Sequence, residues 1–71
     1  MFVYVLCEGY DYEGEEVRGV YASLEEAQAA AAAYRRDRYI GDYLIVYARE
    51  VGAAAVDVDS VWFQRHDEVV E

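Results

Sequence analysis

The 71-residue sequence contains no proline, lysine, asparagine or threonine, and it has one cysteine and one histidine. A lone cysteine cannot form an intramolecular disulfide, which is the cross-link that small secreted domains commonly use. We therefore expect a reducing, cytoplasmic location. One cysteine and one histidine are also too few ligands for a structural zinc site.

Positive charge is scarce as well, because six arginines stand against fifteen acidic residues and leave a formal net charge of -9. Nucleic acid and anionic membranes both attract positively charged proteins, so this balance argues against direct binding to either. The apolar run from Phe2 to Cys7 has no basic flank and is followed by Glu8, so we expect neither a signal peptide nor a membrane span. A protein partner with a basic surface is electrostatically favoured, although an acidic surface also keeps a small protein soluble.

Catalytic signatures are missing from the sequence too. Cys7 and His66 are its thiol and its imidazole, and Cys7 lies in an apolar run, where a free cysteine usually acts as a small hydrophobic residue. The carboxylates of residues 11–16, or those of Asp57 and Asp59, lack the spacing of an EF-hand loop. We therefore expect no enzyme, no metal centre and no cofactor.

Apolar residues make up 56% of the chain and include eight tyrosines, which indicates a folded protein, and the length indicates one domain. Short runs of aliphatic, aromatic and β-branched residues predict four strands. Their expected bounds are Phe2–Cys7, Val17–Ala22, Asp42–Val51 and, as a short edge strand, Val56–Asp59. Because the first run is apolar on both faces, we expect it to be a central strand.

One helix is predicted between the second and third strands. Ser23 and Glu26 have the spacing of a capping box, in which each side chain bonds the amide of the other residue. The alanine-rich run that follows has high helix propensity, the arginines of residues 35–38 suit a carboxyl end, and Gly41 marks the stop. The face expected to pack on the sheet holds Leu24, Ala27, Ala31 and Tyr34.

These elements predict an α+β fold of order ββαββ, in which one alanine-rich helix packs on one face of a small antiparallel sheet of three to four strands. We expect residues 1–65 to form a single domain and residues 66–71 to be a frayed acidic tail. The uncovered sheet face would then be an apolar patch and a candidate dimer face, covered either by a bulky plug at Val61–Phe63 or by a second copy of the chain. Its expected members are Phe2, Tyr4, Leu6, Ile45 and Tyr47.

The loop between the first two strands is the candidate partner-binding surface, because it combines tyrosines with acids. Tyrosine carries a large contact area at little entropic cost, and clustered carboxylates repel one another until a positive group neutralises them. The candidate residues are Tyr10, Asp11, Tyr12, Glu13, Glu15 and Glu16. The alternative is a solvated hairpin tip whose tyrosine rings lie back on the sheet.

Several short segments carry a resemblance. They are Tyr4-Val5-Leu6, Gly9-Tyr10, Gly19-Val20-Tyr21 and Ser23-Leu24-Glu25-Glu26-Ala27. In these segments, between Val3 and Val51, the chain resembles small uncharacterised ββαβ-type proteins of bacteria and their phages. The resemblance implies a hairpin followed by a capped helix and a bacterial or phage origin, and it implies no functional residues.

Three functions stay open. We expect a non-catalytic acidic protein-binding module, and its most specific form is a phage-encoded inhibitor that mimics nucleic acid on a host defence or nucleic-acid-handling protein. One alternative is a structural homodimer or oligomer built through the uncovered sheet face without a ligand. The other is a small protein that binds a divalent metal or another ligand through its acidic clusters.

Overall fold

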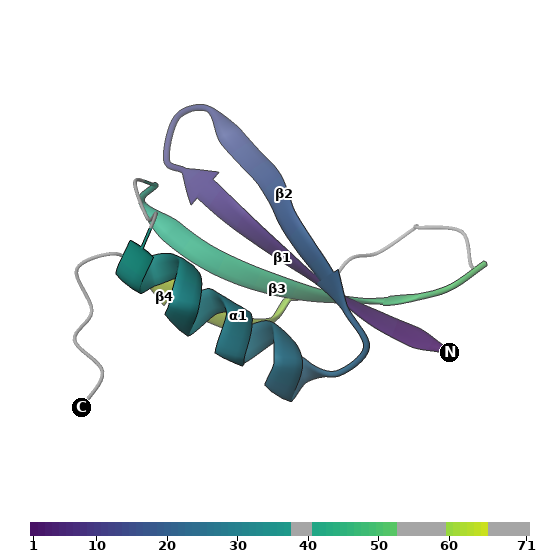
Figure 1. The fold of residues 1–71 in the computed structure, drawn as a ribbon. Coiled ribbons are helices and arrows are strands. Elements are labelled where there is room, and N and C mark those ends of the chain that lie inside the picture. The colour runs from purple at the N-terminus through teal and green to yellow at the C-terminus, as the bar shows by residue number, and fades with distance from the viewer. Residues whose placement is uncertain (38–40, 53–59, 66–71) are drawn as a thin grey trace.

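The computed structural model describes residues 1–37, 41–52 and 60–65. Four strands and one helix follow one another in the order ββαββ (Figure 1). Their bounds are β1 Phe2–Tyr10, β2 Gly14–Tyr21, α1 Leu24–Asp37, β3 Tyr43–Glu50 and β4 Ser60–Arg65. The predicted fold class and element order are confirmed.

The strands form one antiparallel sheet in the spatial order β2-β1-β3-β4. A hairpin joins β1 to β2, and α1 then carries the chain past β1, so that β3 pairs with the other edge of β1. As its apolar pattern predicted, β1 is a central strand. Helix α1 lies on one side of the sheet, and no described element covers the other side (Figure 1).

Helix α1 begins directly after Ser23, whose hydroxyl oxygen accepts a hydrogen bond of 3.1 Å from the Glu26 amide. The Ser23 hydroxyl in turn donates to the Glu26 carboxylate at 3.2 Å. The predicted bond from the Glu26 amide is therefore confirmed. Glu25 and Glu26 lie in the first turn, and Arg35 and Arg36 lie in the last, where the helix dipole favours each charge.

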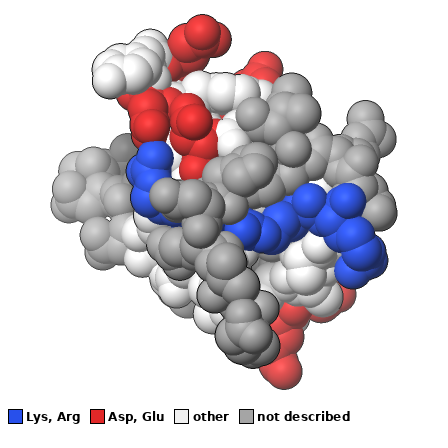
Figure 2. All heavy atoms as spheres, turned by 90° about the vertical axis from the view of Figure 1, so that its left-hand side faces the viewer, with Lys and Arg blue, Asp and Glu red and all other residues white. Residues whose placement is uncertain are grey.

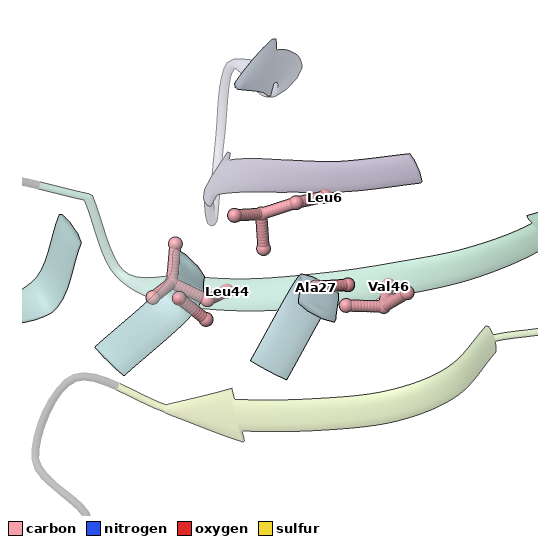
Figure 3. Packing of buried hydrophobic residues seen from close by; sticks show 5 residues of the cluster. Leu6, Ala27, Leu44 and Val46 are labelled. Atoms are coloured by element: carbon pink, nitrogen blue, oxygen red, sulfur yellow. The ribbon is translucent and has the colours of Figure 1, made fainter. Parts of the chain in front are cut away.

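The core is small and lies between α1 and the two central strands. Its five most buried apolar residues are Leu6, Ala27, Ala31, Leu44 and Val46. Figure 3 shows Leu6 of β1 and two side chains of β3 close to Ala27 of α1. Because the helix contributes alanines at this contact, it can approach the sheet closely. Leu24 and Tyr34 also pack against the core, so the predicted helix face is confirmed.

Two strands differ from their predicted bounds. Strand β1 runs on past Cys7 to Tyr10, because its polar end continues to pair with both neighbouring strands. Val61–Phe63, predicted as a plug over the sheet, instead belongs to β4 and pairs with β3 at the edge. The predicted strand Val56–Asp59 and the predicted tail, residues 66–71, lie outside the described residues.

The five residues expected on the uncovered face are divided between the two faces of the sheet, so that expectation is wrong. Leu6 pairs with Val46, and both pack beneath α1. Because side chains alternate along a strand, the residues of β1 that share a side with Leu6 also point to the helix side. The helix side therefore holds Phe2, Tyr4 and Leu6, and the open side holds Ile45 and Tyr47.

Candidate functional site

The hairpin between β1 and β2 ends in a tight turn. The Glu13 amide donates a hydrogen bond of 3.1 Å to the Tyr10 carbonyl, and Gly14 follows with a φ of 87°. Glycine adopts such a positive φ without strain, and a turn followed by this conformation is a common hairpin connection. Tyr12, at the apex of the turn, is 99% exposed. The turn therefore holds this aromatic ring in solvent.

Contacts with the neighbouring part of the sheet hold the hairpin turn in place. The Asp11 amide donates to Asp42 Oδ2 at 2.8 Å, and the Asp42 amide donates to the Gly9 carbonyl at 2.8 Å. An ion pair of 2.9 Å joins Arg65 of β4 to Asp11. An exposed pair of this kind contributes little stability, but with the two backbone contacts it fixes where the turn lies. The tip is therefore a positioned surface.

Glu15 of β2 lies on the open side of the sheet and meets two tyrosines of β3 across β1. Its carboxylate accepts hydrogen bonds from the hydroxyls of Tyr43, at 2.8 Å, and Tyr47, at 2.6 Å. Gly9 permits this crossing, because a Cβ at that position would overlap the Tyr43 ring. The Tyr43 ring also contacts Phe63 of β4, with 5.1 Å between the ring centroids. Side chains of three strands, β2, β3 and β4, are thus joined on the open side.

Both phenols that bond Glu15 ionise less readily than an ordinary tyrosine. The hydrogen bond to Glu15, together with burial and the charge of that carboxylate, raises the pKa of Tyr43 to about 12. Burial, and then its own hydrogen bond to Glu15, raise the pKa of Tyr47 well above its usual value. The phenols therefore stay protonated donors at physiological pH, and Glu15 is engaged within the chain.

Glu8 of β1 is a fully buried carboxylate on the helix side of the sheet. It accepts hydrogen bonds from Arg18 Nε at 3.0 Å, the Tyr34 hydroxyl at 2.5 Å and the Gly41 amide at 2.5 Å. The backbone at Gly41 passes so close that a Cβ there would lie 2.5 Å from Glu8 Cγ. Burying a carboxylate is costly unless such donors surround it. Glu8 therefore ties the hairpin to α1 and to the start of β3.

Arg18 connects this buried carboxylate to the hairpin surface. It lies where the pairing of β2 with β1 shifts register, as at a β-bulge. Its guanidinium lies 2.9 Å from Glu8, 2.8 Å from Glu16 and 3.5 Å from the Tyr10 hydroxyl. The hydrogen bond to Glu8 is the main cause that raises the pKa of Arg18. One arginine thus neutralises an inner and an outer acid.

The structure brings the predicted partner-binding residues together at one end of the sheet but gives them different surroundings. Asp11, Glu15 and Glu16 each have a partner within the chain. Within the part of the chain that the structure describes, the side chains of Tyr12 and Glu13 make no hydrogen bond or ion pair. Tyr12 and Glu13 are therefore the residues of the tip that remain available to a partner.

Sequence reasoning missed the contacts of Glu8 and Arg18. An acid at the end of an apolar run was a usable signal, because such a residue needs a partner if the strand continues. Glu8 marked the end of the strand in the prediction, whereas it pairs with both neighbouring strands.

Cys7 is buried on the open side of β1. Burial and then the charge of Glu15 raise the pKa of its thiol, which makes it a poor nucleophile. His66 lies outside the described residues. Among the residues that are described, no three acidic, histidine or cysteine side chains gather into a metal site, and no helix is both long and apolar enough to cross a membrane.

Charge is unevenly distributed over the surface at the hairpin end of the molecule. Figure 2 shows acidic side chains gathered at the top of the view and arginine side chains in a band across its middle. Two ion pairs join the groups, one between Arg65 and Asp11 and one between Arg18 and Glu16. The acidic cluster is therefore partly neutralised from within the chain.

Comparison with known proteins gives a family. No curated protein and no solved structure matches the chain. A family model described as a domain of unknown function, DUF7336, matches residues 1–53, which include β1 through β3 and leave β4 outside the match. The chain therefore belongs to the DUF7336 family of domains of unknown function.

Proposed function

We propose that this protein is a non-catalytic acidic module that binds a basic protein surface through the tip of the β1–β2 hairpin. The observation that carries the proposal is Tyr12, which is 99% exposed at the apex of a turn held by backbone hydrogen bonds. Tyrosine is a preferred interface anchor. A tip that is already positioned loses little further freedom when it binds, which favours affinity.

The charge of the chain supports the choice of a basic partner. A net charge of -9 attracts such a partner over distance and speeds association. Glu13 lies beside Tyr12 and would make the direct ionic contact. The acids that already have partners within the chain contribute to the long-range electrostatic attraction. Binding should weaken as salt rises, because exposed charges are screened over about 8 Å at physiological ionic strength.

The most specific form of this proposal is a phage-encoded inhibitor whose acids take the place of phosphates on a host defence or nucleic-acid-handling protein. Its support is the net charge. Because Asp11 and Glu16 are already paired with arginines, we assign anchoring to Tyr12 and steering to the charge. If the mimicry form holds, duplex DNA competes with the protein for the partner. If it does not, DNA has no effect on binding.

Affinity capture from a lysate of the source cells, with Tyr12→Ala as a parallel bait, supplies the partner for the test. The dissociation constant of the purified partner is then measured for each variant. We expect Tyr12→Ala to raise it at least about tenfold and Glu13→Gln to raise it less. Glu25→Gln, which removes an exposed carboxylate at the start of α1, is the matched control and should leave it unchanged. Equal affinities for the wild type and Tyr12→Ala would contradict the proposal.

A further inference from the structure

The side of the sheet opposite α1 exposes apolar side chains on both outer strands. Val17 and Val20 of β2 are 61% and 59% exposed, and Phe63 of β4 is 46% exposed. Between them, Cys7 and Ile45 of the central strands are only 5% and 8% exposed. The open side therefore has a well-packed centre and exposed apolar side chains along each edge strand. Association with another surface would bury these side chains.

Two rows of paired residues cross this open side from one edge to the other. The apolar row consists of Val17, Cys7, Ile45 and Phe63. The charged row beside it consists of Glu15, Gly9, Tyr43 and Arg65. The charged row thus carries an acid on the β2 edge and an arginine on the β4 edge. If a second copy presents the same row in the opposite order, apolar residues meet apolar residues in the first row, and the acid meets the arginine in the second.

We propose that a second copy of the chain covers this open side, related by a twofold axis that runs parallel to the strands between β1 and β3. Such an axis places β2 of one copy over β4 of the other and keeps each row at its own level. Glu15 then faces Arg65 of the second copy, and Val17 faces Phe63 of the second copy. Aligned sheets stack about 10 Å apart, a distance that these side chains can bridge.

Glu15 can make the new contact without giving up its present ones. A carboxylate has about four lone-pair sites, and the two phenols occupy two of those on Glu15. The acceptor sites that remain on Glu15 can therefore accept from Arg65 of the second copy.

Strand β4 is essential to this arrangement, since it supplies both Phe63 and Arg65. The family model ends at residue 53, before β4 begins. The proposed interface thus includes residues outside the segment that the family model matches.

The area of the open side sets the expected strength of the dimer. Strands spaced about 4.8 Å apart and about 26 Å long give a footprint of about 500 Å² on each copy. The buried total of about 1,000 Å² lies at the low end for specific interfaces, so we expect a dissociation constant in the micromolar range. The net charge of -9 on each copy also opposes association, which is why the measurement belongs at physiological salt.

Sedimentation velocity on charge-reversed variants tests the proposed pairing. Glu15→Arg places two positive groups opposite each other, and Arg65→Glu places two negative groups opposite each other. We therefore expect each variant alone to dimerise at least about tenfold more weakly than the wild type. Mixing the two variants restores opposite charges at both contacts, so a heterodimer should form. Glu25→Arg, which reverses a charge on the helix side, should dimerise like the wild type.

A second variant covers the case in which a reversed charge prevents folding. Val17→Asp changes a side chain that is already 61% exposed, so the fold should persist by circular dichroism while the dimer dissociates. A wild type that is monomeric at millimolar concentration would overturn the proposal. Folded reversed variants that dimerise normally alone, or fail to associate when mixed, would also overturn it.

Discussion

Replacing Glu8 by glutamine tests the claim that one buried carboxylate ties the hairpin to the helix. Donors approach both of its oxygens, with Arg18 and Tyr34 at Oε1 and the Gly41 amide at Oε2. An amide NH₂ at either position therefore faces a donor and removes a charge-assisted bond. Breaking a buried ionic contact costs about 3 to 5 kcal/mol. We expect the lower value, about 3 kcal/mol, because the side chain of one partner, Arg18, is 29% exposed to water.

That loss is large for a chain of this size, because 71 residues correspond to about 4 to 10 kcal/mol of total stability. Urea unfolding followed by circular dichroism measures it. With a slope of about 1 kcal/mol per molar urea, the midpoint should fall by about 3 M.

Glu16→Gln is the matched control, because Glu16 contacts the same arginine but its side chain is 62% exposed. An exposed pair contributes little, so this variant should lose less than about 0.5 kcal/mol. If Glu8→Gln unfolds at the same urea concentration as Glu16→Gln, the reasoning about the buried network is refuted.

Three further predictions follow from the contacts of the sheet and the helix cap. Gly9→Ala displaces the Tyr43 ring and should destabilise the fold by about 1 to 3 kcal/mol in urea unfolding, while no loss would show that the ring moves freely. The pKa of Tyr43 is raised to about 12, so its stabilising contribution is complete below about pH 10, where an unfolded tyrosine starts to ionise, and is lost as pH rises to about 12. Ultraviolet titration should show this late ionisation, and Glu15→Gln should move it to lower pH; an unchanged titration would contradict the hydrogen bond. Ser23→Ala removes the acceptor of the helix cap and should cost about 1 kcal/mol by thermal unfolding, whereas Ser23→Asp should retain most of the stability.

The helix and the central position of β1 were predictable because local signals indicate them. Ser23 and Glu26 lie three positions apart, and alanine favours a helix whatever packs on it. The apolar run of β1 likewise identified a central strand. These features depend on neighbours in the sequence, so the sequence alone predicts them.

The open face was not predictable because it depends on register between distant strands. Both β1 and β3 are apolar on each face, and a shift by one residue exchanges the faces. The prediction put Leu6 and Ile45 on the same face, whereas the register pairs Leu6 with Val46 and so places Ile45 on the other face. In addition, no strand was predicted for Ser60–Arg65, where the structure has β4.

The buried network escaped prediction for the same reason. The donors that surround Glu8 lie 10, 26 and 33 positions away in the sequence. No spacing rule for a single element links residues over such separations. Only the folded sheet, with α1 against it, brings these groups to one carboxylate.

The central claim is that partners bind the hairpin tip, and amide chemical-shift mapping tests it most directly. Isotope-labelled protein is titrated with the purified captured partner at physiological salt. The account predicts that the largest shifts fall on residues 10–14 and shrink when salt is raised. Shifts centred on the exposed side of α1, with residues 10–14 unchanged, would contradict it.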